Sequence, residues 1–248
     1  MTSLNDFNRK FVETRMTGEA KSNGPAVWVR DFLKQFYTVD ASGRAFISNS
    51  ISIESLILKQ AAQFEIHSFG RVSEDVGQLI AHFSATDFDC DALARSLLFE
   101  SAESGWSFPK SLLPNAKDIV AGKKNPEKQG SRYWKIRTRN QVGAMALLVL
   151  TDPEGFGLDA TRNPATNDRL CGCDLLANAT AGRGWASITH AAATEIWRNR
   201  TRLIAEFHCN YVLTGASQLG RRIDPEQAFQ LLGALLLYPM ASGRKAKI

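Results

Sequence analysis

Residues 133–150 read YWKIRTRNQVGAMALLVL, and this stretch places the chain among helical proteins. A helix is predicted from Tyr133 to Leu150, and DPEGFG at 152–157 ends it. Its second half, Val142 to Leu150, is the longest apolar run in the chain. A run of this length is too short to cross a bilayer, which takes about 18–20 residues. The N-terminus also lacks the apolar stretch of a signal peptide, so we expect no membrane contact.

Helical spacing of apolar residues recurs on both sides of this stretch. Helices are predicted from Pro25 through Phe36, from Glu54 to Phe64, after a Ser73 cap, and from a capping box at Thr86-x-x-Asp89 to about Ser104. The longest helix is expected from Trp185 to Leu213, with a charge ladder of Glu195, Arg198, Arg202 and Glu206 on one face. Asp224-Pro225 begins the last helix, which stops before Pro239.

The predicted fold class is therefore all-α: a two-lobed helical body with an N-terminal arm and at most one short strand or hairpin. Only FISNSISI, at 46–53, alternates as a strand does. The predicted divisions are an arm at 1–25, an N-terminal helical lobe at 26–118, a basic C-terminal helical lobe at 119–240, and a flexible basic tail at 241–248.

Charge is distributed unevenly along the chain. Residues 1–118 contain 12 Lys and Arg against 15 Asp and Glu, a net −3, whereas residues 119–248 contain 18 against 10, a net +8. Such asymmetry favours contact between one lobe and a polyanion. The alternative is an ordinary basic protein that binds no nucleic acid.

Known catalytic and cofactor motifs are absent from the sequence. GKKNPEKQGS is not a phosphate-binding P-loop, and GFG at 155–157 is only a fragment of a dinucleotide fingerprint. Cys171 and Cys173, with His190 or with His208 and Cys209, have side chains that can ligate zinc, but C-x-C is not the usual zinc knuckle. We expect no catalytic residue, no cofactor and no metal, and four buried, reduced cysteines.

The segment with the strongest functional signal is 122–139. It contains seven basic residues, a single acid, Glu127, and two aromatic residues. Basic side chains neutralise phosphates, and aromatic faces stack on unpaired bases. The alternative is a solvated basic loop beside an aromatic pair that fills the core. Together with three arginines further on, the predicted RNA-binding residues are Lys123, Lys124, Lys128, Arg132, Tyr133, Trp134, Lys135, Arg137, Arg139, Arg200, Arg221 and Arg222.

The first residues predict a device for self-assembly. Leu4, Phe7 and Phe11 recur at helical spacing, and TGEAKSNGP at 17–25 breaks the pattern. A short helix is marginal alone in water, so its apolar face needs a groove on its own body or on a neighbour. A flexible tether favours the neighbour, so these three residues are predicted to link subunits into a homo-oligomer.

Trp28-Val29-Arg30-Asp31-Phe32, with Gln35 and an aromatic residue beyond it, resembles the segment after the N-terminal arm in phlebovirus-type nucleoproteins. That resemblance covers about ten residues. It implies a compact helical protein that coats RNA and whose arm docks on the next subunit. Helical coat proteins of flexible filamentous plant viruses share most of these gross features.

The leading hypothesis is a non-enzymatic viral nucleocapsid or filament coat subunit that binds single-stranded RNA without sequence preference. Its expected location is the virion and the host cytoplasm, or the cytoplasm if the protein is not viral. The alternatives are an enzyme or regulatory helical domain with an unrecognised site, and a protein–protein adaptor.

Overall fold

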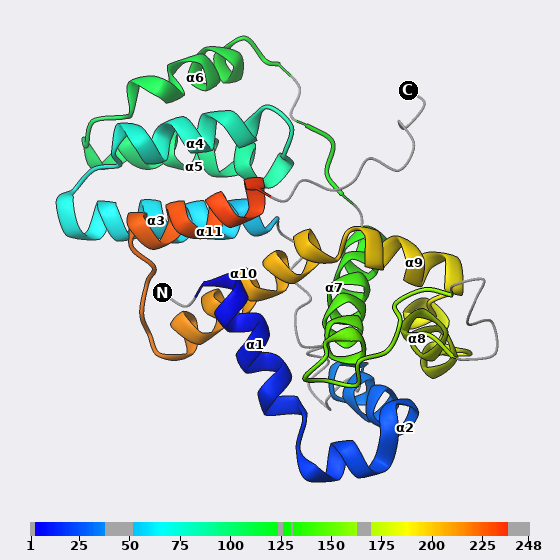
Figure 1. The fold of residues 1–248 in the computed structure, drawn as a ribbon. Helices are drawn as coiled ribbons and strands as arrows, with labels where there is room; N and C mark the ends of the chain where they lie inside the picture. Colours follow the sequence, from blue (N-terminus) through cyan, green and yellow to red (C-terminus); the bar gives the residue numbers. More distant parts are fainter. Residues whose placement is uncertain (1–2, 38–51, 124–125, 130, 163–169, 238–248) are drawn as a thin grey trace. The chain divides into compact units, whose positions relative to one another are not determined.

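A computed structural model describes residues 3–37, 52–123, 126–129, 131–162 and 170–237. Every regular element within these ranges is helical, which confirms the all-α prediction (Figure 1). The predicted strand at 46–53 lies outside the described residues except for its last two, where Ser52 caps a helix that begins at Ile53. None of the described helices combines the length and apolar character that crossing a bilayer requires.

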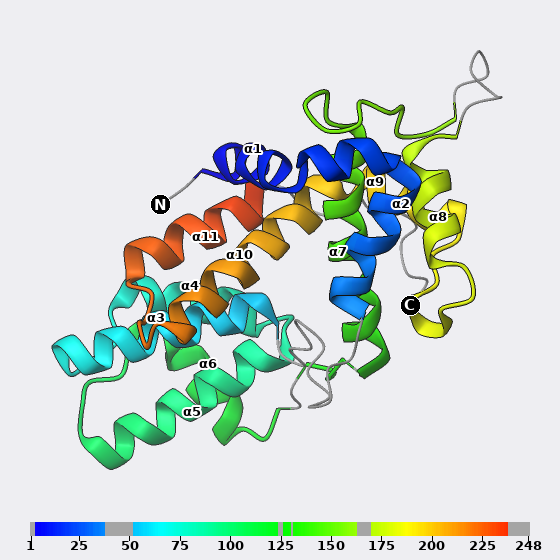
Figure 2. The ribbon, with the colours of Figure 1, turned by 90° about the horizontal axis from the view of Figure 1, so that it is seen from below.

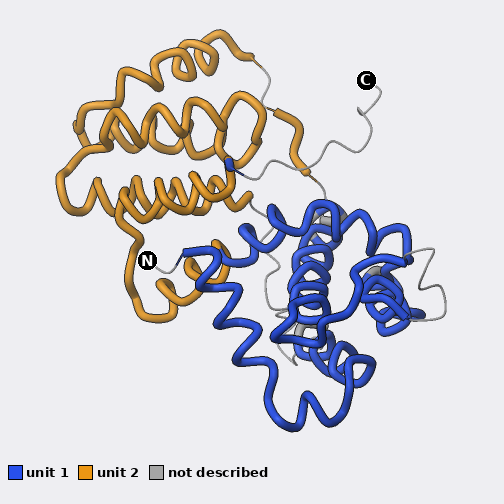
Figure 3. Tube along the Cα trace, viewed as in Figure 1, with its two compact units in different colours: residues 1–48, 132–208, 237–248 blue, residues 49–131, 209–236 orange. Residues whose placement is uncertain are grey.

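The chain forms two compact units that interleave along the sequence (Figure 3). Unit 1 comprises residues 1–48, 132–208 and 237–248, and unit 2 comprises residues 49–131 and 209–236. The predicted division into consecutive lobes is therefore wrong. The proposed boundary at 118/119 falls inside a helix, Leu113–Val120, and the boundary at 25/26 falls inside another, Gly18–Tyr37. Distant segments pack together because their apolar faces match, which sequence order does not reveal.

Unit 1 contains α1 (Leu4–Arg15), α2 (Gly18–Tyr37), α7 (Ser131–Thr151), α8 (Gly172–Thr180), η3 (Gly184–Ala186), α9 (His190–Arg198) and the first half of α10 (Arg200–Gln218). Helix α7 passes among α2, α8, α9 and α10 (Figures 1 and 2). Its apolar half, Val142–Leu150, is buried apart from a partly exposed Leu148, because neighbours cover it on all sides. The predicted helix at 133–150 is thus confirmed.

Unit 2 contains α3 (Ile53–Phe69), α4 (Glu74–Ser84), α5 (Phe88–Ser104), η1 (Lys110–Leu112), α6 (Leu113–Val120), the end of α10 and α11 (Pro225–Leu237). Helices α4 and α5 pack together, α3 packs on both, and α6 packs on α5. Ser73 caps α4 and Asp224 caps α11 as predicted. The cap of α5 is Asp87 rather than the predicted Thr86, because the Asp87 carboxylate accepts the Cys90 N–H at 2.8 Å.

The expected single helix from Trp185 to Leu213 is wrong. Thr189 caps α9, and the helix ends at Asn199, whose side chain donates to the Glu195 carbonyl at 3.1 Å. Asn199 is buried and leaves the helical conformation, so α10 starts afresh at Arg200. The predicted charge ladder is divided between the two helices: Arg198 pairs with Glu195 at 3.6 Å in α9, and Arg202 pairs with the buried Glu206 at 2.8 Å in α10.

The predicted flexible stretch at 17–25 is largely helical. Only Met16 and Thr17 separate α1 from α2, and the Thr17 hydroxyl accepts the Ala20 N–H at 3.2 Å. The break comes later, at Gly24, which has φ 75° and ψ 167°. This backbone conformation suits glycine, and Pro25 then restarts the helix as predicted.

Candidate nucleic-acid interface

The predicted basic segment is divided between the two units at residue 132. In unit 2, Lys123 forms an ion pair with Asp118 at 2.6 Å, and the Lys128 ammonium lies 5.4 Å from the centre of the Phe88 ring. Lys124 lies outside the described residues. Both described lysines therefore have local partners in a unit that is acidic as a whole.

Arg221 and Arg222, in the turn that joins α10 to α11, also belong to unit 2. Arg222 donates to the Gln63 carbonyl of α3 at 3.2 Å, so it holds the turn against that helix. Arg221 is exposed, and its side chain has no partner among the described residues.

The rest of the basic segment forms the first two turns of α7 in unit 1. Lys135 and Arg139 lie one turn apart on this helix. Lys135 is exposed, whereas Arg139 donates to the Ser187 carbonyl at 2.9 Å and to the Asn140 side chain. Arg132 and Trp134 lie in the helix, but their side chains fall outside what the structure describes.

A buried carboxylate joins α7 to α10. The Glu206 side chain is 1% exposed and accepts hydrogen bonds from Arg137 at 2.8 and 3.1 Å, from Arg202 at 2.8 Å and from Gln141 at 2.9 Å. Arg137 also contacts the exposed Tyr133 hydroxyl and ring. Two guanidinium groups therefore share one carboxylate, and this network, which we call the Glu206 network, keeps one net positive charge.

Arg200 stands at the first position of α10. Its guanidinium lies 3.7 Å from the centre of the Trp197 ring and donates to the Trp197 carbonyl at 3.0 Å. A cation stacked on an indole is held in place by the ring's negative face. The guanidinium covers one face of the indole, and Trp197 is partly buried against the unit 1 core, so the stack presents a positive group held in a fixed position.

The predicted assembly residues lie against the body of their own chain. Leu4, Phe7 and Phe11 pack on the unit 1 core. The Phe11 ring meets the Phe207 ring edge-on at 6.2 Å, and the Phe7 ring lies 4.5 Å from the His208 ring. The apolar face of α1 is thus satisfied within the chain, which removes the argument that it must seek a neighbour.

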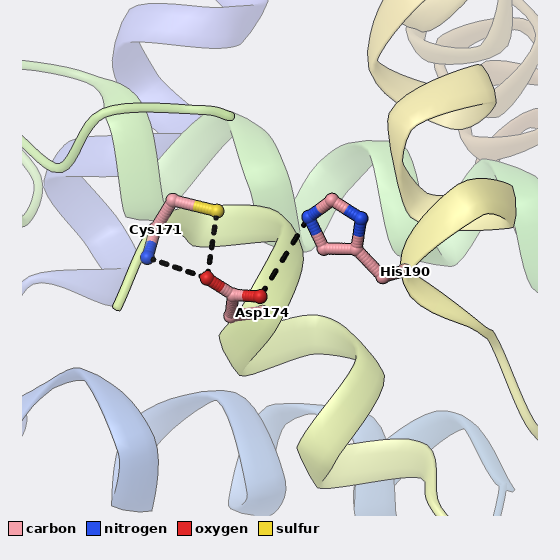
Figure 4. Close-up of side chains that lie close together, drawn as sticks. All are labelled: Cys171, Asp174 and His190. Carbon is pink, nitrogen blue, oxygen red and sulfur yellow. Dashed lines mark hydrogen bonds and ion pairs between the residues drawn. The ribbon is translucent and has the colours of Figure 1, made fainter. Parts of the chain in front are cut away.

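A second polar cluster lies at the start of α8, where Cys171 and His190, two of the residues weighed for zinc, meet Asp174, which the zinc hypothesis did not include (Figure 4). Asp174 lies between Cys171 and His190: its carboxylate accepts the Cys171 thiol at 3.1 Å and lies 3.6 Å from His190 Nε2. The Arg162 guanidinium donates to the same carboxylate, with a shortest distance of 2.8 Å. Asp174 is also at the third helical position and accepts the Cys171 N–H, a spacing that could have indicated a capping interaction from the sequence.

The electrostatics of this cluster favour a structural role. Hydrogen bonds from Arg162 hold the pKa of Asp174 well below its usual range, and burial raises the pKa of the Cys171 thiol. A protonated thiol bonded to a carboxylate, with no histidine between them, is not an activated nucleophile. The three side chains offer a sulfur, an oxygen and a nitrogen within 4.8 Å of one another, as a metal would need. However, Arg162 already supplies the positive charge that neutralises Asp174.

Comparison with known proteins adds no relative. No protein-family model matches this chain. Searches of curated proteins and of solved structures also returned no match. The resemblance to phlebovirus-type nucleoproteins therefore stays a prediction.

Proposed function

We propose that this protein binds single-stranded RNA with little sequence preference, mainly through unit 1, as a nucleocapsid or coat subunit. The observation that carries the proposal is the segregation of charge between the units. Unit 1 contains 20 Lys and Arg against 12 Asp and Glu, a net +8, whereas unit 2 contains 10 against 13, a net −3. Phosphate neutralisation supplies most of the affinity in binding of this kind.

Two features of unit 1 support a surface for RNA rather than scattered charge. The Glu206 network holds Arg137 and Arg202 in fixed positions, and Lys135 is exposed one turn from Arg139. The Arg200–Trp197 stack adds another cation held in a fixed position. Side chains held in place in advance lose less conformational entropy on binding than free ones.

The test is a titration of fluorescent single-stranded RNA of mixed sequence at several salt concentrations. We expect affinity to fall steeply with salt, and the Lys135→Glu variant to bind more weakly with a shallower salt dependence. Lys59→Glu, on α3 of unit 2, is the matched control, because it makes the same change at another exposed lysine. Salt-insensitive binding, or equal effects of the two variants, would contradict the proposal.

Self-assembly is the second part of the proposal. Since α1 covers Phe32 and Phe207 through its own Phe11, the same contact would form if neighbouring subunits exchanged α1. Light scattering of the full chain with long RNA tests this, with a chain lacking residues 1–16 as the comparison. Assembly that persists without α1 would exclude exchange as the link. The truncated chain should also melt at a lower temperature, because Phe32 and Phe207 are each only 2% exposed when α1 is present.

A further inference from the structure

A cavity of about 940 Å³ lies within unit 2, between the end of α3, the start of α4 and the segment 107–110. Five side chains in its lining are relevant to binding: Glu65, Phe69, Arg71, Phe108 and Lys110. They combine a buried acid, two aromatic rings and two cations. None of them belongs to the proposed RNA surface of unit 1.

The wall of this cavity is fixed by close packing. The two oxygens of Glu74 accept the backbone N–H groups of Lys110 at 2.9 Å and Ser111 at 2.7 Å. Gly77 lets the same segment approach α4, because a Cβ there would lie 2.6 Å from the Cβ of Pro109. The segment that carries Phe108 and Lys110 is therefore held in place before any ligand arrives.

Glu65 is the unusual member of the lining. The residue is 5% exposed, and one carboxylate oxygen accepts the Ser73 N–H at 2.7 Å. Within the described part of the chain, its other oxygen accepts no hydrogen bond. That oxygen is not closed off from solvent, so it is free to accept from a ligand that brings an N–H group into the cavity.

The other side chains specify the rest of the ligand. Phe69 is 68% exposed and Phe108 is partly buried, so both offer apolar faces to a flat ring. The side chains of Arg71 and Lys110 are exposed and have no partner among the described residues. A flat ring with an N–H donor, joined to an anionic group, is the chemistry of a nucleotide.

We propose that this cavity binds a nucleotide whose base carries an amino group, with cytosine as the reference case. The amino group donates to Glu65, the ring lies against Phe69, and the phosphate faces Arg71 and Lys110. A carboxylate accepts well from the cytosine amino group. Uracil has a carbonyl oxygen at that position. Its N3–H can donate to the carboxylate only with this oxygen close to the negative charge, which repels it. The nucleotide is either free or one unit of an RNA strand, and both sources present the same groups.

The experiment titrates cytidine and uridine monophosphates into the full chain by calorimetry. We expect the cytidine nucleotide to bind about tenfold more tightly, the size of one charged hydrogen bond. In Glu65→Gln, the amide oxygen still accepts from Ser73, and the new N–H₂ group faces the cavity, so the preference should shift to uridine. Phe69→Ala should weaken both nucleotides, whereas Lys117→Ala, at an exposed lysine on α6 outside the cavity, should change neither.

Parallel titrations with oligocytidylate and oligouridylate identify the source of the nucleotide. Binding of the free nucleotide indicates a small-molecule site. A cytidine preference that only the oligonucleotides show, and that Glu65→Gln removes, indicates a base of a bound strand. If Glu65→Gln does not fold, Phe69→Ala and the double change Arg71→Ala and Lys110→Ala test the site by loss of cytidylate binding, because all three side chains are exposed.

Equal binding of the two bases, or a cytidine preference unaffected by these variants, would overturn the proposal. The result of this nucleotide titration is independent of the result of the RNA-binding test on unit 1. Lys135→Glu should weaken RNA binding without changing the affinity for the free cytidine nucleotide, so either proposal can fail while the other holds.

Discussion

Replacing Glu206 with Gln tests whether the network that joins α7 to α10 contributes stability and limits the positive charge of unit 1. The change keeps the size of the side chain but removes its charge and turns one acceptor into a donor. Arg137 and Arg202 then lose their shared counter-ion, and one N–H₂ group faces their donors. The buried position of Glu206 leaves little water to take over its role.

The expected loss of stability follows from the burial of the partners. Removing one member of a buried ion pair costs about 3–5 kcal/mol. The Arg137 and Arg202 side chains are 24% and 12% exposed, so each can turn partly toward water, and we expect about 2–3 kcal/mol. For a chain of this size, that corresponds to a melting temperature roughly 4–12 °C lower.

Thermal melting and RNA titration should be measured on the same preparations. Under the proposed function, the two released guanidinium groups increase the positive charge that RNA meets, so Glu206→Gln should bind RNA more tightly, and the slope of log K against log salt should steepen by up to about 1. Asp31→Asn is the matched control. It also removes one acid from unit 1, but Asp31 is 55% exposed in a surface pair with Lys34, so its melting temperature should hardly change.

Two results would count against this reasoning. If Glu206→Gln melts like Asp31→Asn, the Glu206 network contributes no stability. If it is destabilised but binds RNA no more tightly than Asp31→Asn, the network serves the fold and does not face RNA.

Three further outcomes are expected. Burial lowers the pKa of His208 below its usual 6.5, so on acidification the unfolded chain takes up the proton first. The stability that His208 contributes above pH 6.5 should therefore fall as the pH drops toward its pKa in the folded chain. The free energy of unfolding, measured with denaturant, should differ less between pH 7.5 and pH 5.5 in His208→Gln than in the unchanged chain. Gly77→Ala should destabilise the protein by about 1–3 kcal/mol, because the new Cβ clashes with Pro109. Gly233→Ala has open space around it in α11 and should stabilise the protein by up to about 1 kcal/mol. Equal melting temperatures of the two variants would refute the close packing of Pro109 on Gly77. All four cysteines are buried, and burial raises the pKa of Cys173 to about 12, so a thiol reagent at pH 8 should label the native chain slowly and the denatured chain at four sites.

Local signals in the sequence were sufficient for most helices. The apolar run after Gln141, the serine cap before Glu74 and the Asp224-Pro225 start each correspond to a helix, because capping and apolar spacing act within a few residues. The helix break at Asn199 and the cap at Asp87 escaped prediction. Each depends on which of several neighbouring polar side chains reaches the backbone, and sequence spacing does not decide between them.

The sequence by itself determined that the chain is helical and that its second half is basic. Only the tertiary structure decided how these features combine: Glu206 became a buried counter-ion for two arginines, α1 packed on its own body, and Glu65 came to line a cavity with two aromatic rings. The physical reason is the separation along the chain of the residues that interact. Helix formation and net charge depend on neighbours along the chain, whereas burial of a carboxylate depends on side chains from other elements, such as Arg137, which is 69 residues away from Glu206.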